Sequence, residues 1–188
     1  AFSSIAHAGY IMIGVAAIYS SDATLSPLGV TSVVFYLIAY ILTNLLAFGA
    51  VMTFGRVTGS DEIVSYNGLS RRHPWLAIAM LVGFLSLSGM PPFGGFIAKI
   101  LVFAAAIKVG LVWLAVVGII NSIVGLYYYL IVLKHIYPYR DEATENQPLP
   151  ISRSYAIALT VLVLGVILIG TLFAPWFNMT SMGALNLF

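Results

Sequence analysis

Lys99 is a charged residue inside a long apolar segment of this 188-residue sequence. Its near neighbours are Phe96, Ile97, Ile100, Leu101 and Val102. A lysine at the centre of a bilayer costs about 2.5–3.5 kcal/mol on insertion scales, so such residues face a bundle interior or a water-filled path. Because loss of water disfavours the charged amine, a buried lysine can take up and release a proton. Lys99 is the first candidate for proton transfer; the alternative is a side chain that extends to the interface near Ile107, roughly 12 Å along the helix.

A helix-breaking run precedes Lys99. It reads Gly89-Met90-Pro91-Pro92-Phe93-Gly94-Gly95. Two adjacent prolines disfavour a continuous helix, and unwound backbone at membrane depth needs protein or water to satisfy its polar groups. Discontinuous helices of this kind are common along ion pathways, so we expect the break to serve Lys99. A passive proline kink is the alternative.

His7 belongs to a polar stripe in the first apolar segment, because Ser3, His7 and Tyr10 recur at helical spacing on one face. A histidine titrates near neutral pH and can relay protons. It can equally remain neutral and hydrogen-bond between helices. The sequence leaves both interpretations open for His7.

Two further rows of polar residues lie in later apolar segments. They are Tyr36, Tyr40, Thr43 and Asn44 in one, and Asn121, Ser122, Gly125, Tyr128 and Tyr129 in another. From these rows we select Tyr40, Asn44, Asn121 and Tyr128, with Ser3 and Tyr10, as a supporting polar path. The alternative is that they only hold helices together.

The composition predicts that these residues are positioned by transmembrane helices. The sequence is 61% hydrophobic and only 7% charged, with mean hydropathy +1.04, whereas about a quarter of a soluble domain is charged. We predict an all-α integral membrane protein, one membrane domain over residues 1–188 with about five transmembrane helices. The expected helices span residues 2–19, 30–55, 75–107 with a break at Gly89–Gly95, 111–136 and 155–173.

Several function classes are excluded. The basic residues are scattered, unlike those of a nucleic-acid binder. The sequence contains no cysteine, which excludes thiolate-held iron–sulfur clusters, and it shows no phosphate loop or metal-binding motif. No metal site is therefore expected.

Loop charges predict the orientation. Basic residues follow the second and fourth segments, namely Arg56, Arg71, Arg72, Lys134, Arg140 and Arg153, whereas Lys108 lies at the opposite side. By the positive-inside rule the basic loops are cytoplasmic and the C-terminus is not. Since Ala1 begins directly in an apolar segment, we expect the chain to be the C-terminal part of something longer.

Three motifs resemble a known family. AFSSIAHAGY at residues 1–10, LSLSGMPPFGGFIAK at 85–99 and GLYYYL at 125–130 are similar to the antiporter-like, proton-translocating subunits of respiratory complex I (NADH-quinone oxidoreductase), above all the subunit N or ND2 type. The resemblance implies the last five helices of a fourteen-helix subunit. It also implies that Lys99 is the proton-transfer lysine of a broken helix and that His7 lies on the hydrophilic axis.

The same resemblance implies a non-redox part of a translocase that binds no cofactor itself. NADH, FMN, iron–sulfur clusters and quinone would lie in or near other subunits, and the partners would be other membrane-arm subunits, the lipid bilayer and protons. The expected location is a bacterial inner membrane, with a thylakoid or organellar membrane as the alternative. Two other functions stay open: a subunit of a multisubunit cation/proton antiporter or membrane-bound hydrogenase, and a structural membrane spacer.

Overall fold

The computed structural model describes residues 2–18, 26–139 and 148–185, and all regular structure within these ranges is helical. This confirms the predicted all-α class. The helices are α1 (Phe2–Ala16), α2 (Ser26–Thr58), the 3₁₀ helix η1 (Ile63–Tyr66), α3 (Leu69–Arg72), α4 (Pro74–Ser88), α5 (Gly94–Lys108), α6 (Val112–Ile136), α7 (Arg153–Thr171) and α8 (Phe173–Leu185).

Three of these helices, α2, α6 and α7, are long and apolar enough to cross a membrane by length and composition, and α1 and α4 are shorter apolar helices. The count of five spans stays a prediction. The expected end of the first span at Tyr19, and Ala1 and Arg140 in the orientation argument, lie outside the described residues.

The structure departs from the predicted boundaries in two places. Part of the polar segment between Arg56 and Pro74 is helical, as η1 and α3, rather than loop. The last predicted helix stops at Thr171 and a separate helix, α8, follows. Pro175 follows the predicted end of the last helix at residue 173, but it lies in the first turn of α8, where a proline removes no intrahelical hydrogen bond.

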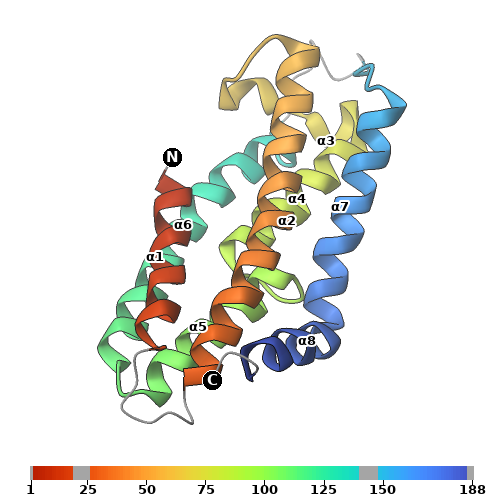
Figure 1. The fold of residues 1–188 in the computed structure, drawn as a ribbon. Coiled ribbons are helices and arrows are strands. Elements are labelled where there is room, and N and C mark those ends of the chain that lie inside the picture. The colour runs from red at the N-terminus through yellow and green to blue at the C-terminus, as the bar shows by residue number, and fades with distance from the viewer. Residues whose placement is uncertain (1, 19–25, 140–147, 186–188) are drawn as a thin grey trace.

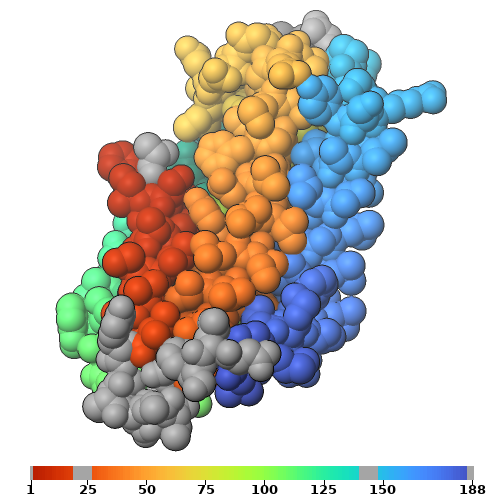
Figure 2. Space-filling model, viewed as in Figure 1, coloured from red at the N-terminus to blue at the C-terminus, as the bar shows by residue number. Residues whose placement is uncertain are grey.

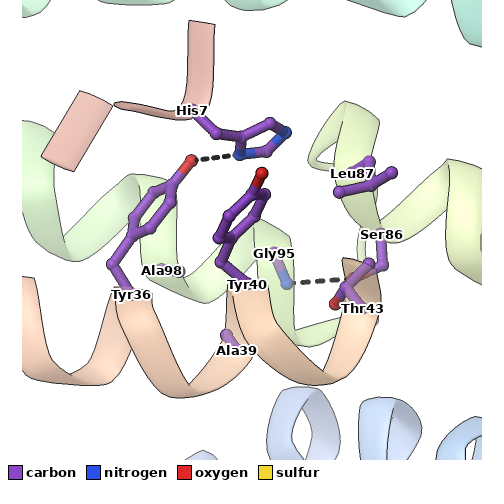
Figure 3. Close-up of a pocket in the computed structure, with 9 residues that line it drawn as sticks. All are labelled: His7, Tyr36, Ala39, Tyr40, Thr43, Ser86, Leu87, Gly95 and Ala98. Carbon is purple, nitrogen blue, oxygen red and sulfur yellow. Dashed lines mark hydrogen bonds between the residues drawn. The ribbon is translucent and has the colours of Figure 1, made fainter. Parts of the chain in front are cut away.

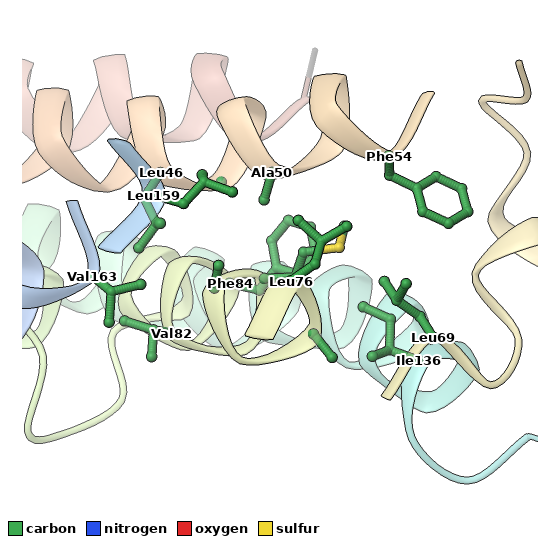
Figure 4. Close-up of a cluster of buried hydrophobic side chains, with 14 of the residues drawn as sticks. Leu46, Ala50, Phe54, Leu69, Leu76, Val82, Phe84, Ile136, Leu159 and Val163 are labelled. Atoms are coloured by element: carbon green, nitrogen blue, oxygen red, sulfur yellow. The ribbon is translucent and has the colours of Figure 1, made fainter. Parts of the chain in front are cut away.

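The long helix α2 is the centre of the bundle (Figure 1) and packs against α1, α4, α5, α7 and α8. One core cluster joins α2, α4 and α7; Leu46, Ala50 and Phe54 lie at successive turns of α2, with Leu46 beside Leu159 of α7 and Phe54 at the other end of the row (Figure 4). A second core cluster joins α1, α2 and α5. The two clusters hold α4 and α5 on opposite sides of the break.

The break itself is a well-defined turn. Gly89 has φ +85°, its N–H donates to the Ser86 carbonyl at 3.0 Å, and the Met90 N–H donates to the Leu85 carbonyl at 2.9 Å. This is the Schellman pattern that ends helices at a left-handed glycine. The Pro91-Pro92 bond is cis, and α5 begins at Gly94.

Close backbone contacts fix the break against its neighbours. A Cβ atom on Gly95 would collide with the Ser86 carbonyl, and one on Gly170 of α7 would collide with the backbone of Pro92 and Phe93. Both positions therefore require glycine, because the obstructing atoms are main chain. As a result, α4, α5 and α7 meet at a single point.

We predict that Gly170→Ala destabilises the protein by about 1–3 kcal/mol, because the added methyl group overpacks this contact. Gly165→Ala on the same helix is the control, since its Cβ would meet only Leu42 Cδ1, at 3.9 Å. The measurement is the thermal unfolding midpoint of the detergent-solubilised protein. Equal midpoints for the two variants would contradict the predicted role of Gly170.

Candidate functional site

Lys99 is buried, with 6% of its surface exposed. Its ammonium group, Nζ, donates hydrogen bonds to the Leu87 carbonyl at 3.0 Å, the Ser88 carbonyl at 2.8 Å and the Ser122 hydroxyl at 2.8 Å. These three acceptors match the three donors of an ammonium group. The side chain turns back toward α4 and does not extend toward Ile107.

The two carbonyls belong to the last turn of α4, where carbonyl groups lack intrahelical donors and carry the negative end of the helix dipole. The break supplies this helix end within reach of Lys99. All of the partners that the structure gives the ammonium are neutral groups, including the ring of Tyr10, whose centroid lies 5.2 Å from Nζ. The positive charge is therefore held by dipoles and by an aromatic face.

Gly89 leaves the space that the lysine stem occupies. A Cβ atom there would lie 2.8 Å from Lys99 Cδ and 3.0 Å from Nζ. Gly89 therefore both caps α4 and leaves room for the Lys99 side chain.

His7 is buried on α1, with 4% of its surface exposed. Its Nδ1 atom lies 2.7 Å from the Tyr36 hydroxyl of α2, and its ring stacks on Tyr40 at 4.8 Å between centroids. Leu87 of α4 lines the same small cavity as the His7 ring. Figure 3 shows the imidazole between Tyr36 and Leu87, directly above Tyr40.

Leu87 lies between the two titratable residues. Its carbonyl accepts a hydrogen bond from Lys99 Nζ, and the residue lines a small cavity together with His7. Between His7 and Tyr36, the tautomer of the ring decides which group donates the hydrogen.

A small cavity of about 10 Å³ adjoins this point (Figure 3). Its lining consists of His7, Tyr36, Ala39, Tyr40, Thr43, Ser86, Leu87, Gly95 and Ala98. Thr43 and Ser86 share a hydroxyl hydrogen bond of 3.0 Å on one wall. The volume is at the lower limit for one water molecule, and the wall offers polar partners for it.

The structure brings together some of the predicted path residues. Tyr10 and Tyr40 pack around His7, and the Ser3 hydroxyl bonds to the Tyr129 hydroxyl. Asn44 is half-buried on α2 but does not line the cavity.

Asn121 and Tyr128, also selected for the polar path, both lie on the exposed side of α6. The Asn121 amide donates to the Val117 carbonyl of its own helix at 3.2 Å, and Tyr128 is 57% exposed. The neighbouring residues Ser122 and Tyr129 make the inward contacts instead.

Tyr36, Ser122 and Tyr129 make contacts at the site but are absent from the predicted polar path, although all three belong to the polar rows of the sequence. For α6 a usable signal existed. Ala115, Gly118 and Ser122 form a row of small residues at helical spacing, the pattern typical of a face packed against other helices. The roles of the Leu87 and Ser88 carbonyls had no side-chain signal.

A family model described as NADH:quinone oxidoreductase/Mrp antiporter, TM, matches residues 1–125. NADH-quinone oxidoreductase subunit N of Heliobacterium modesticaldum is 36% identical over 188 residues, which is all of this chain and 38% of that protein. The subunit N of Moorella thermoacetica is 37% identical, with the same coverage. The chain thus spans 38% of the length of these relatives.

Solved structures share the fold. A chain of the Mrp complex from Dietzia sp. superposes with a TM-score of 0.83 at 23% identity, covering 99% of this chain and 41% of that one. A chain of respiratory complex I from Thermus thermophilus superposes with a TM-score of 0.68 at 24% identity, covering 94% of this chain and 44% of that one.

We predict that Tyr36→Phe destabilises the protein by about 1–3 kcal/mol, because it leaves a buried ring nitrogen of His7 without its hydrogen-bond partner. Tyr128→Phe removes the same hydroxyl from an exposed site and is expected to change stability by less than about 0.5 kcal/mol. Thermal unfolding compares the two variants, and ¹⁵N NMR of the His7 ring reports loss of the hydrogen bond at Nδ1. An unchanged ring spectrum in Tyr36→Phe would contradict the hydrogen bond between His7 Nδ1 and the Tyr36 hydroxyl.

Proposed function

The chain belongs to the NADH:quinone oxidoreductase/Mrp antiporter family, and from this premise we propose that it is part of a proton-translocating subunit in the membrane arm of an NADH-quinone oxidoreductase. The observation that carries the proposal is the buried ammonium of Lys99, held by neutral acceptors at the end of α4. Relatives at 36–37% identity that bear the subunit N name support this assignment over the antiporter and hydrogenase alternatives.

The surroundings of Lys99 suit both protonation states. The charged amine donates to the Leu87 and Ser88 carbonyls. A hydroxyl can donate or accept, so Ser122 accepts from the ammonium and can turn to donate to the neutral amine. A carboxylate partner would hold the charged form far more strongly. The site can therefore load and release a proton without leaving a buried group unpaired.

His7 is the next group in the proposed path. The cavity beside it is also lined by Leu87, whose carbonyl accepts from Lys99, and has room for one water molecule. A proton leaving Lys99 can pass toward α1 through this water and the imidazole, which gains a proton on one nitrogen while losing one from the other. The Tyr36 hydroxyl would reorient as the ring protonates.

Redox chemistry is assigned to other subunits, which would hold NADH, FMN, iron–sulfur clusters and quinone. The chain itself supplies a proton path and no electron transfer. Its proposed setting is a bacterial inner membrane, among other membrane-arm subunits, with the C-terminus on the non-cytoplasmic side.

We expect Lys99→Ala, placed in the full-length subunit, to leave the complex assembled while reducing proton pumping about a hundredfold or more, the scale of losing one proton-transfer group. Pumping and coupled quinone reduction are measured in inverted membrane vesicles. Lys99→Arg should also fail, because a guanidinium does not release its proton. Lys108→Ala, at an exposed helix end, is the matched control.

Two results would contradict this role for Lys99. Full pumping by assembled Lys99→Ala would exclude it from the proton path. Loss of assembly alone, with normal pumping by the complexes that do form, would favour the structural spacer.

His7→Phe is expected to reduce pumping less than Lys99→Ala, because cavity water and the neighbouring tyrosine hydroxyls remain as a partial route. The same vesicle assay compares the two variants over a range of pH. Normal pumping by His7→Phe at every pH would assign the imidazole a purely structural role.

A further inference from the structure

A groove of about 130 Å³ lies between α2 and α7, away from the Lys99 site. Its lining is mostly apolar and consists of Gly49, Met52, Thr53, Arg56, Tyr155, Ala158, Leu159 and Leu162. Figure 2 shows the two helices side by side on one face of the molecule, α2 in orange and α7 in blue. The groove is therefore a surface feature that faces whatever surrounds the bundle.

Arg56 stands at one end of the groove, two residues before the end of α2. Its guanidinium donates to the Tyr155 hydroxyl and lies 5.6 Å from the centre of the Tyr155 ring. Both partners are neutral. The Asp61 carboxylate lies over the adjacent Gly55, and the structure gives no ion pair between it and Arg56 in the described part of the chain. Among the residues that the structure describes, no carboxylate forms an ion pair with the positive charge at the groove's end.

Along the groove, the charge, the aromatic ring and the apolar wall follow the order of the layers of a membrane, from the charged headgroups through the interface to the hydrocarbon core. An arginine and a tyrosine at the end of two spanning helices lie at headgroup level, and this end of the bundle is the one predicted to face the cytoplasm. The cytoplasmic leaflet is rich in anionic lipid. Four of the five guanidinium N–H groups remain for a phosphate after Tyr155 takes one, and their planar fork fits two phosphate oxygens.

The size of the groove limits which kinds of molecule can bind in it. An α-helix with its side chains is about 10 Å across, too wide to enter a hollow of 130 Å³. A single hydrocarbon chain is narrow enough to follow it. We propose that this groove binds an anionic phospholipid, with the phosphate on Arg56 and an acyl chain along the wall formed by Met52, Ala158 and Leu162.

The test uses the intact complex, containing the full-length subunit, in bilayers with photoactivatable phosphatidylglycerol or phosphatidylcholine that carries a diazirine on one acyl chain. Cross-linked peptides are located by mass spectrometry. We expect labelling around Met52 and Leu162 to be about tenfold stronger with phosphatidylglycerol, the scale of one charge-assisted contact. Excess unlabelled phosphatidylglycerol should compete, and phosphatidylcholine should not.

Arg56→Gln is expected to lower the phosphatidylglycerol labelling to the phosphatidylcholine level. Lys108→Gln, which removes the same charge from the other end of the bundle, should leave it unchanged. Ala158→Phe provides an independent variant that fills the groove and keeps Arg56; it should abolish labelling by both lipids.

Three outcomes would overturn the proposal. Equal labelling by the two lipids would mean that the groove holds ordinary surrounding lipid and does not select an anionic headgroup. Absence of labelling in the unmodified complex would mean that another protein chain covers the groove. Labelling that survives Ala158→Phe would place the lipid elsewhere. None of these outcomes depends on proton pumping, so they are separable from the proposed function.

Discussion

The hydrogen bonds from Lys99 to the last carbonyls of α4 are the interaction on which the rest of the site depends. An ammonium inside a bundle must recover the hydration that it loses, and a helix interior cannot help because its carbonyls are already bonded. A helix end placed at the same depth provides free acceptors. The interruption between α4 and α5 is what provides such an end next to the lysine.

Three glycines keep that helix end in position. Gly89 ends α4 and leaves room for the lysine stem, while Gly95 lets the start of α5 approach Ser86. On the far side, Gly170 allows α7 to press against the backbone of the break. The position of the Lys99 amine and its acceptors thus depends on three helices, α4, α5 and α7. The two core clusters pack these helices together.

The sequence predicted the helical class and the position of the break, because apolar length and adjacent prolines are strong local signals. It also singled out Lys99 and His7, both of which the structure buries. It did not predict which face of α6 turns inward. That helix is apolar around its whole circumference, so Asn121 and Ser122, one residue apart, could not be separated by hydropathy. It also missed α8, since a proline in a first turn looks the same as a helix stop until the neighbouring helix is known.

The Leu87 and Ser88 oxygens that hold the lysine are main-chain atoms. Any amino acid at these two positions would supply them, so substitution there tests packing and leaves the acceptors in place. The atoms can be removed only by changing the path of the chain. Genetic screens that score side chains would therefore detect these hydrogen bonds at distant glycines such as Gly170, and would leave the two residues that supply the acceptors unmarked.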